Sequence, residues 1–191
     1  MKFEIKNNPW NFPYAPKAEA EFSRDEDGFN ITLRAYETEI RFVNDGRNLP
    51  VYQDSCLEFF FSPFTGEKRP YFNFEINPLG SLYTGFSADG TRAGSGPVAG
   101  ELPGDYFRIK SMSKSYAENF SGPYWEVSYH VPFEYMEKFL PEVNFRELKE
   151  ITANFYKCGD LTSSEHYLSW NNIETETPDF HVPEYFGHIK L

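Results

Sequence analysis

The sequence predicts an all-β protein, an antiparallel β-sandwich, on two observations. The 13 glycines and 14 prolines interrupt the 191-residue chain about every seven residues, and short runs rich in Phe, Tyr, Val and Ile lie between them. Several of these runs alternate apolar with polar residues, as strands with one buried face do. A sheet that is apolar on one side needs a second layer to cover it, so two packed sheets are expected.

The first strands follow from this alternation. In residues 29–36, Phe29, Ile31 and Leu33 alternate with polar neighbours, which predicts a half-buried strand. Residues 39–43 are predicted to form the next strand.

The strongest local signal is a hairpin. Its two runs read QDSCLEFFFSPF and YFNFEINPLGSLY, and the intervening TGEKRP predicts a turn at Gly66-Glu67. Antiparallel pairing around that turn sets Glu58 opposite Glu75. The same register sets Cys56 opposite Asn77 and Phe60 opposite Asn73. One face is then expected to be mostly polar, and the other to be core, formed by Leu57, Phe59, Phe61, Phe72, Phe74 and Ile76.

The later elements are predicted in the same way. Trp125, Val127 and Tyr129 alternate with polar residues, so residues 125–131 are expected to be a strand that Pro132 stops. Residues 133–140 have the spacing of one or two helical turns, ended by Pro141. Strands are also expected at 151–156 and within 181–191. The glycine-rich stretch 87–105 is expected to be a long mobile loop.

Length and charge exclude several classes of protein. One domain spanning 1–191 is expected, because this length supports one sizeable core and the composition does not change at mid-chain. The net charge of −11 argues against nucleic acid and anionic membrane surfaces as partners. The longest apolar run is Phe59-Phe60-Phe61, so no membrane span is expected. The N-terminus MKFEIKNNPW lacks the apolar stretch of a signal peptide. Localisation stays open, because removal of a signal would make the protein secreted or periplasmic.

Glu58 and Glu75 form the first candidate site. Opposite one another across a strand pair, their Cβ atoms would lie about 5 Å apart. Three interpretations stay open: two solvated carboxylates on a polar sheet face, a pair that contacts a ligand, or the two carboxylates of a retaining glycosidase. As a ligand-contacting pair they would bind a cation or accept hydrogen bonds from sugar hydroxyls.

Metal chemistry has a weaker signal. The four histidines have neither HxxxH nor HExxH spacing, and Cys56 and Cys158 are expected to be buried thiols. A zinc site that combines Cys158 with His166 and His181 is one hypothesis. In so acidic a chain calcium is favoured over zinc, although no EF-hand loop is present.

Aromatic residues are abundant, with 20 Phe, 13 Tyr and 3 Trp. Most must be core. Exposed flat rings stack on the C–H faces of sugars, while Asn, Asp, Glu and Gln side chains hold the hydroxyl groups. The aromatic residues that lie near turns or beside polar residues are the candidates for such a platform: Tyr52, Phe60, Tyr83, Trp170 and Phe180.

Several segments of the sequence, in this order along the chain, resemble the family 9 carbohydrate-binding modules and their DOMON-like relatives. The hairpin is similar to the family's strand with an Asp shortly before a Glu, here Asp54 and Glu58, followed by a strand that ends in Asn, here Asn77. WEVSYHVPF resembles the strand that runs into a Pro-containing turn, and ITANFYKC the next strand, with Asn154. LSWNN and DFHVPEYFGHIKL resemble the family's terminal Pro, Phe and Gly pattern, which falls on Pro183, Phe186 and Gly187.

The resemblance implies a jelly-roll-like β-sandwich with a sugar cleft. The family's two clamping tryptophans fall on Val51, beside Tyr52, and on Phe180. Its binding Glu falls on Glu58, and its binding Arg falls on Glu75. Trp170 is available to replace a missing clamp. Family members often carry structural calcium, which the acidic composition permits.

Together these observations predict a non-catalytic carbohydrate-binding module, tied to glycan degradation or uptake, whose partner is a mono- or oligosaccharide. The predicted ligand-binding residues are Tyr52, Asp54, Glu58, Glu75, Asn77, Asn154, Trp170 and Phe180. Two alternatives stay open: a sugar-active enzyme that uses Glu58 and Glu75, and a protein-interaction domain that has lost sugar binding.

Overall fold

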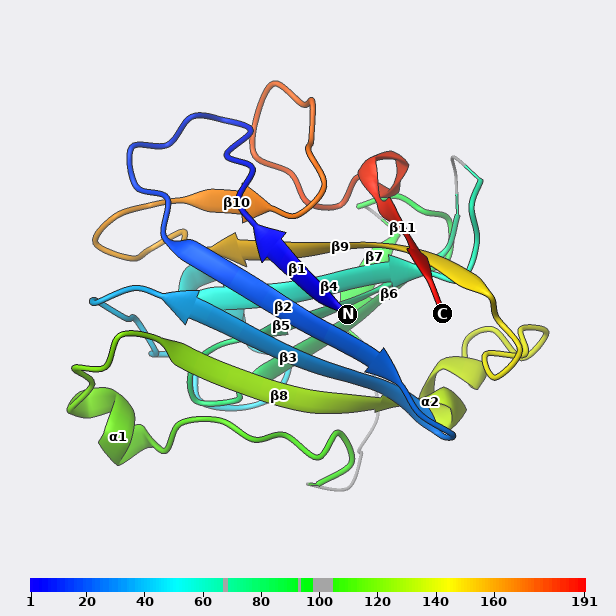
Figure 1. Cartoon of the computed structure of the whole chain (residues 1–191), viewed down its shortest axis with the longest axis horizontal. Helices are drawn as coiled ribbons and strands as arrows, with labels where there is room; N and C mark the ends of the chain where they lie inside the picture. The colour runs from blue at the N-terminus through cyan, green and yellow to red at the C-terminus, as the bar shows by residue number, and fades with distance from the viewer. Residues whose placement is uncertain (67–68, 93, 98–104) are drawn as a thin grey trace.

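The computed structural model describes residues 1–66, 69–92, 94–97 and 105–191, which form two antiparallel sheets packed face to face (Figure 1). The first sheet has the strand order β1 (Lys2–Ile5), β2 (Lys17–Arg24), β3 (Gly28–Tyr36) and β8 (Trp125–Pro132). The second has the order β10 (Tyr167–Ser169), β9 (Glu150–Cys158), β4 (Cys56–Ser62), β5 (Tyr71–Ile76), β6 (Leu82–Ser87) and β7 (Ser95–Pro97). Strand β11 (Gly187–Lys190) also pairs with β9. The β-sandwich prediction is confirmed.

Short helical elements connect the strands. They are α1 (Lys114–Glu118), α2 (Phe133–Glu137) and the 3₁₀ turns η1 (Val51–Gln53) and η2 (Pro183–Tyr185). Helix α2 lies where one or two helical turns are predicted, and its last turn continues through hydrogen bonds from the Phe139 and Leu140 amides to the Met136 carbonyl. No helix in the described ranges is long and apolar enough to cross a membrane.

The core between the sheets is largely aromatic. On β4, Phe59 and Phe61 face the first sheet, and their rings stack at 5.2 Å between centroids. Phe59 also stacks on Phe155 of β9 at 5.0 Å, and Phe61 stacks on Phe72 of β5 at 5.2 Å. Across the sandwich, Phe59 packs on Phe22 of β2 and Phe61 packs on Phe29 of β3, with centroids 5.7 and 5.5 Å apart. Burying each such side chain contributes about 2 kcal/mol, so these rings hold the second sheet against the first.

The predicted hairpin register is confirmed within the ladder between β4 and β5. Glu58 pairs with Glu75 and Phe60 with Asn73, while Leu57 pairs with Ile76 at the end of the ladder. The six residues expected on the core face all lie in the main core. The predicted turn at Gly66-Glu67 falls partly outside the described residues.

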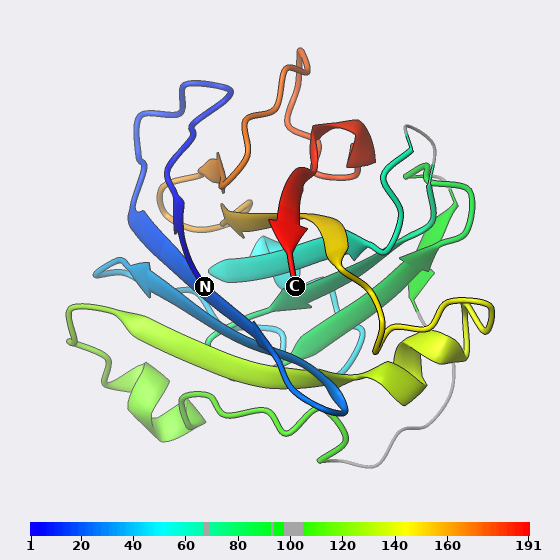
Figure 2. The same cartoon turned by 45° about the vertical axis from the view of Figure 1, so that its right-hand side comes forward.

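The opposite face of this sheet differs from the prediction, because it is covered. Residues 171–186 cross it and form a second apolar cluster with the outer side chains of β4, β5 and β9. Trp10 anchors this segment: its indole N–H donates to the Thr175 carbonyl at 3.0 Å, and its ring lies 5.9 Å from that of Phe180. In Figure 2 the loop before β2 and the loop after β10 rise on the same side of the sandwich.

The strand predicted at 39–43 does not form. Its amides bond to side chains instead of to a neighbouring strand: the Arg41 amide donates to Ser55 Oγ at 3.1 Å, and the Val43 amide donates to Asp54 Oδ1 at 3.1 Å. In the stretch 87–105, predicted to be a loop, the described part includes the short strand β7, paired with β6. Residues 93 and 98–104 of that stretch lie outside the described ranges.

A buried ion pair joins the end of β3 to β9. Lys157 Nζ lies 3.3 Å from Glu37 Oε1, and both side chains are almost fully buried. Glu37 also accepts a hydrogen bond from the indole N–H of Trp125 at 2.6 Å. The ammonium contacts His166 Nε2 at 2.7 Å, and burial, followed by this charge, lowers the pKa of His166 to about 3. His166 is therefore a neutral acceptor, and Glu37 supplies the countercharge.

Replacing Glu37 with Gln should lower the free energy of unfolding by about 3 kcal/mol, because the charge of Lys157 would stay buried without a partner. Urea denaturation at pH 7 measures this change. Glu21→Gln removes the exposed ion pair with Lys2 and serves as the control, with an expected change of at most about 1 kcal/mol. Equal effects of the two substitutions would contradict the role given to the buried pair.

Candidate functional site

A pocket of about 480 Å³ lies on the face of the second sheet that points away from the first sheet. Its floor comes from the outward-facing residues of β4, β5, β6 and β9, and its walls come from η1 and the 178–181 segment. The residues that line it are Asn48, Pro50, Tyr52, Glu58, Phe60, Glu75, Tyr83, Arg92, Cys158, Asp160, Tyr167, Pro178, Asp179, Phe180 and His181.

Strand register explains why the floor residues meet. Glu58 pairs with Glu75 on one side of β4 and with Tyr156 on the other, and Glu75 pairs in turn with Tyr83. Directly opposed residues in a sheet point to the same face. Cys158 lies on this face too, two residues after Tyr156. The hairpin thus delivers both predicted carboxylates to one pocket.

The two floor glutamates are buried, so the interpretation of them as solvated carboxylates is wrong. Glu58 is 2% exposed and Glu75 is 5% exposed. Burial, and then the neighbouring Glu75, raises the pKa of Glu58 well above its ordinary value. Burial raises the pKa of Glu75 to about 7. In both groups a raised pKa favours the protonated form, and a protonated carboxyl group donates a hydrogen bond as well as accepting one.

Protein groups donate a hydrogen bond to one oxygen of each glutamate. Cys158 Sγ donates to Glu58 Oε1 at 3.0 Å, and Asn73 Nδ2 donates to Glu75 Oε1 at 2.9 Å. Beside them, burial raises the pKa of Asp160 to about 6, and its Oδ1 is buried without a hydrogen-bond partner among the described residues. The floor therefore offers polar atoms to a ligand.

Aromatic rings line the walls to different depths. Tyr52 of η1 is 41% exposed at the rim. Phe180 is 8% exposed, because its ring stacks on Tyr156 with centroids 4.0 Å apart and an interplanar angle of 4°. The Tyr156 hydroxyl also donates to the Phe180 carbonyl at 3.2 Å. Tyr52 and Phe180, predicted from separate parts of the sequence, lie on the same pocket, but Tyr52 has the more accessible ring.

Asp54 and Asn77 do not line the pocket. The fully buried Asp54 carboxylate accepts hydrogen bonds from the Val43 and Asn44 amides and from Asn77 Nδ2, at 2.9 to 3.1 Å. Asn77 Oδ1 accepts from the Leu79 and Ser81 amides. Both side chains hold loops in place, because their polar atoms satisfy backbone groups that no strand pairs.

Asn154 and Trp170 also lie outside the pocket lining. Asn154 Nδ2 donates to the Asn171 carbonyl at 3.0 Å, and its Oδ1 accepts from the Asn171 amide at 2.8 Å, which fixes the start of the covering segment. The Trp170 ring packs against Phe3 with centroids 4.7 Å apart. Trp170 therefore packs at the edge of the core and not on the pocket.

Several pocket residues were missed from the sequence. They include Asn48, Arg92, Asp160, Tyr167 and Asp179, whereas His181 was named from the sequence only for a zinc site. Tyr167 pairs directly with Cys158 across β9 and β10, and the Asp160 amide bonds to the Tyr52 carbonyl at 3.3 Å. His181 follows Phe180, and its Nδ1 lies 2.8 Å from the Tyr71 hydroxyl. For Asp179 and His181, adjacency to Phe180 was a local signal; the other contacts depend on long-range pairing.

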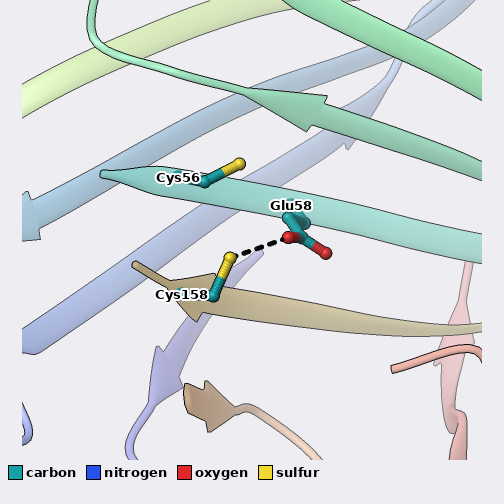
Figure 3. A group of neighbouring side chains, drawn as sticks. All are labelled: Cys56, Glu58 and Cys158. Atoms are coloured by element: carbon teal, nitrogen blue, oxygen red, sulfur yellow. Dashed lines mark hydrogen bonds between the residues drawn. The ribbon is translucent and has the colours of Figure 1, made fainter. Parts of the chain in front are cut away.

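Two groups of described side chains have converging metal-ligand atoms. Cys56, Glu58 and Cys158 form the first, at the pocket floor (Figure 3). Asp25, Asp27 and His130 form the second, in which both carboxylates are exposed. Neither group offers the all-oxygen ligand set that calcium prefers, since one contains two thiols and the other an imidazole. Neither fits the structural calcium implied by the resemblance. The combination of Cys158 with His166 and His181 is in neither group.

Comparisons with known proteins bear on the family and the fold. A sequence profile described as carbohydrate-binding family 9 matches residues 2–191. No protein with a curated description matches significantly. A candidate carbohydrate-binding protein from Bacteroides uniformis has a similar structure, with a TM-score of 0.78 and 26% identity over 100% of this chain and 85% of that chain.

Two structures of a family 9 module from Caldicellulosiruptor kristjanssonii share the fold at 12% identity. The complex with glucose has a TM-score of 0.58 and covers 97% of this chain and 82% of that chain. The complex with cellotriose has a TM-score of 0.62 and covers 98% of this chain and 80% of that chain.

Asp54→Ala should lower the free energy of unfolding by about 3 kcal/mol, because it leaves buried amide donors without an acceptor. Chemical denaturation measures the change. Asp45→Ala in the same loop is the control, since the Asp45 side chain is exposed, and it should have little effect. A small loss for Asp54→Ala would contradict the structural role and return Asp54 to the candidates for ligand contact.

Stability should depend on pH through Glu75. Between its ordinary pKa of 4.5 and its folded pKa of about 7, the folded protein keeps a proton that the unfolded chain has released. The contribution of Glu75 to stability therefore falls as the pH rises through this window. The free energy of unfolding of the Glu75→Gln variant should exceed that of the native chain by on the order of 2 kcal/mol at pH 8 and by little at pH 5. Urea denaturation at the two pH values measures the difference. Exposed Glu118→Gln is the control. If the stability difference between Glu75→Gln and the native chain were the same at both pH values, the raised pKa of Glu75 would be contradicted.

Proposed function

The chain belongs to carbohydrate-binding family 9, a family of non-catalytic modules, and from this premise we propose that its pocket binds a mono- or oligosaccharide without chemical turnover. One observation carries the proposal: a single pocket combines an accessible aromatic ring, that of Tyr52, with three carboxyl groups at its floor, and Asp160 Oδ1 among them has no hydrogen-bond partner in the described part of the chain. Sugars present this same combination of apolar C–H faces and ring hydroxyls.

The aromatic contribution comes mainly from tyrosines. Tyr52 lies at the rim, Tyr83 projects from β6 beside Glu75, and Tyr167 projects from β10 beside Cys158. A sugar ring stacked on Tyr52 would gain about 1 kcal/mol beyond burial. Phe180 forms part of the wall, but one face of its ring is already stacked on Tyr156.

The polar contribution comes from the floor. A sugar hydroxyl both donates and accepts hydrogen bonds, and carboxyl groups that are partly protonated near neutral pH also do both. Glu75, with its pKa of about 7, and Asp160, with its pKa of about 6, meet this requirement. The volume of about 480 Å³ lies within the range of small-molecule sites. The family 9 structures with glucose and cellotriose support a saccharide of one to a few residues as the ligand.

The cross-strand placement of Glu58 and Glu75 supports a second candidate, retaining glycoside hydrolysis. That chemistry needs two carboxyl groups about 5 Å apart, one ionised and one protonated. The pKa of Glu58 lies well above its ordinary value, which favours the protonated form, while Glu75, with a pKa of about 7, is partly ionised near pH 7. Family membership favours binding, and the assay for released sugar separates the two functions.

A glycan array followed by calorimetry tests the proposal. Tyr52→Ala should weaken binding of an array hit about 10-fold, as expected from the loss of roughly 1.4 kcal/mol of stacking. Tyr116→Ala, which removes a more exposed tyrosine on α1 outside the pocket lining, should bind like the native chain. The bound glycan should be recovered intact by chromatography after prolonged incubation.

Three results would contradict the proposal. Binding that survives Tyr52→Ala unchanged would place the ligand elsewhere. Release of a shorter glycan that stops in Glu58→Gln would favour the enzyme. A folded protein that binds no glycan would favour the interaction domain.

A further inference from the structure

We propose that Cys56, Glu58 and Cys158 form a binding site for a thiophilic divalent ion of the zinc type at the floor of the pocket. The site goes beyond carbohydrate binding and does not depend on it. Figure 3 shows Cys56 and Glu58 on β4 and Cys158 on the adjacent β9, with the Cys158 thiol directed at the Glu58 carboxyl group.

Strand pairing brings the three ligands together. Cys56 and Cys158 are direct partners in the antiparallel ladder of β4 and β9. Glu58 lies two residues after Cys56, so its side chain points to the same face. Strand-borne ligands are held more precisely than ligands on loops. The site is thus fixed by the sheet itself.

The distances fit a tetrahedral ion. One ligand atom from each residue lies within 4.8 Å of the other two, and Cys158 Sγ lies 3.0 Å from Glu58 Oε1. Zinc bonds of about 2.3 Å to sulfur and about 2.0 Å to oxygen place such ligand atoms roughly 3.5 to 3.8 Å apart. Small side-chain rotations therefore suffice to enclose the ion.

The fourth coordination position faces the pocket. Glu58 and Cys158 both line it, whereas the fully buried Cys56 lies behind them. An ion held by these three residues would have an entry path and one position open for water or a ligand hydroxyl. Zinc sites with three protein ligands keep their fourth position for water or another small ligand.

Ligand chemistry selects the class of ion. Two sulfur donors favour zinc and similar ions over calcium or magnesium, which require oxygen. The floor also lacks a cation among its described lining residues: Arg92 lies at the rim and pairs with Asp179 at 3.1 Å. On binding, each thiol releases its proton to solvent, as does Glu58 where protonated, and no electrons are transferred.

Titration with Co²⁺ under reducing conditions, without sugar, tests the site. The native chain should bind one equivalent with the near-ultraviolet charge-transfer absorption of cobalt thiolates, and Zn²⁺ should displace it. Cys56→Ser and Cys158→Ser should each abolish this absorption. Glu58→Gln should weaken binding by more than the roughly 10- to 100-fold cost of losing an outer-shell partner. Asp27→Asn, in the exposed second group, is the control and should bind like the native chain.

A second measurement uses only the native chain. Zn²⁺ should slow alkylation of its two free thiols and raise its melting temperature, whether or not the serine variants fold. The proposal is overturned if the reduced native chain shows no thiolate absorption and no thiol protection, or if the absorption persists in a folded Cys56→Ser variant. Glycan binding measured with a chelator present tests the proposed function separately.

Discussion

Burial of β4 on both faces is the constraint from which the rest of the structure follows. Because successive side chains point to opposite faces, one strand contributes Phe59 and Phe61 to the core and Glu58 and Phe60 to the pocket side. A shift of one residue in register would put carboxyl groups into the aromatic core and phenyl rings into the pocket. The packing that stabilises the sandwich therefore also fixes the position of the site.

The same register explains how much of the fold was predictable from the sequence. Alternation and a turn signal are local properties, so the β4–β5 pairing, the strand at Trp125 and the short helix after Pro132 were all found. Local patterns did not reveal that residues 171–186 would cover the polar face, because their contacts come from distant parts of the chain. The strand expected at 39–43 does not form for a related reason: the Arg41 and Val43 amides donate to the side chains of Ser55 and Asp54, which lie outside that segment.

The pocket was only partly predictable, because the sequence does not show which group a polar side chain will contact in the folded protein. Tyr52, Glu58, Glu75 and Phe180 reach the pocket, whereas Asp54 bonds to backbone amides. An acidic side chain in or beside a strand can line a pocket, as Glu58 and Glu75 do, or accept hydrogen bonds from a loop, as Asp54 does. Only the fold distinguishes these two roles. Asp160 and Tyr167 were missed because their position depends on how β9 pairs with β10 and how the following turn meets η1. Carboxyl groups with raised pKa values, two thiols and aromatic rings thus share one small volume.

The contact of Trp10 with the Thr175 carbonyl, across 165 residues of sequence, has a consequence for the order of assembly. Contacts so far apart along the chain form late, because the intervening residues must first be brought into place. On the ribosome, Trp10 can pack on Tyr167 first, but its hydrogen bond to the covering segment must wait until Thr175 has emerged. A nascent chain can therefore build much of its first sheet before residues 178–181, which form one wall of the pocket, can take their place.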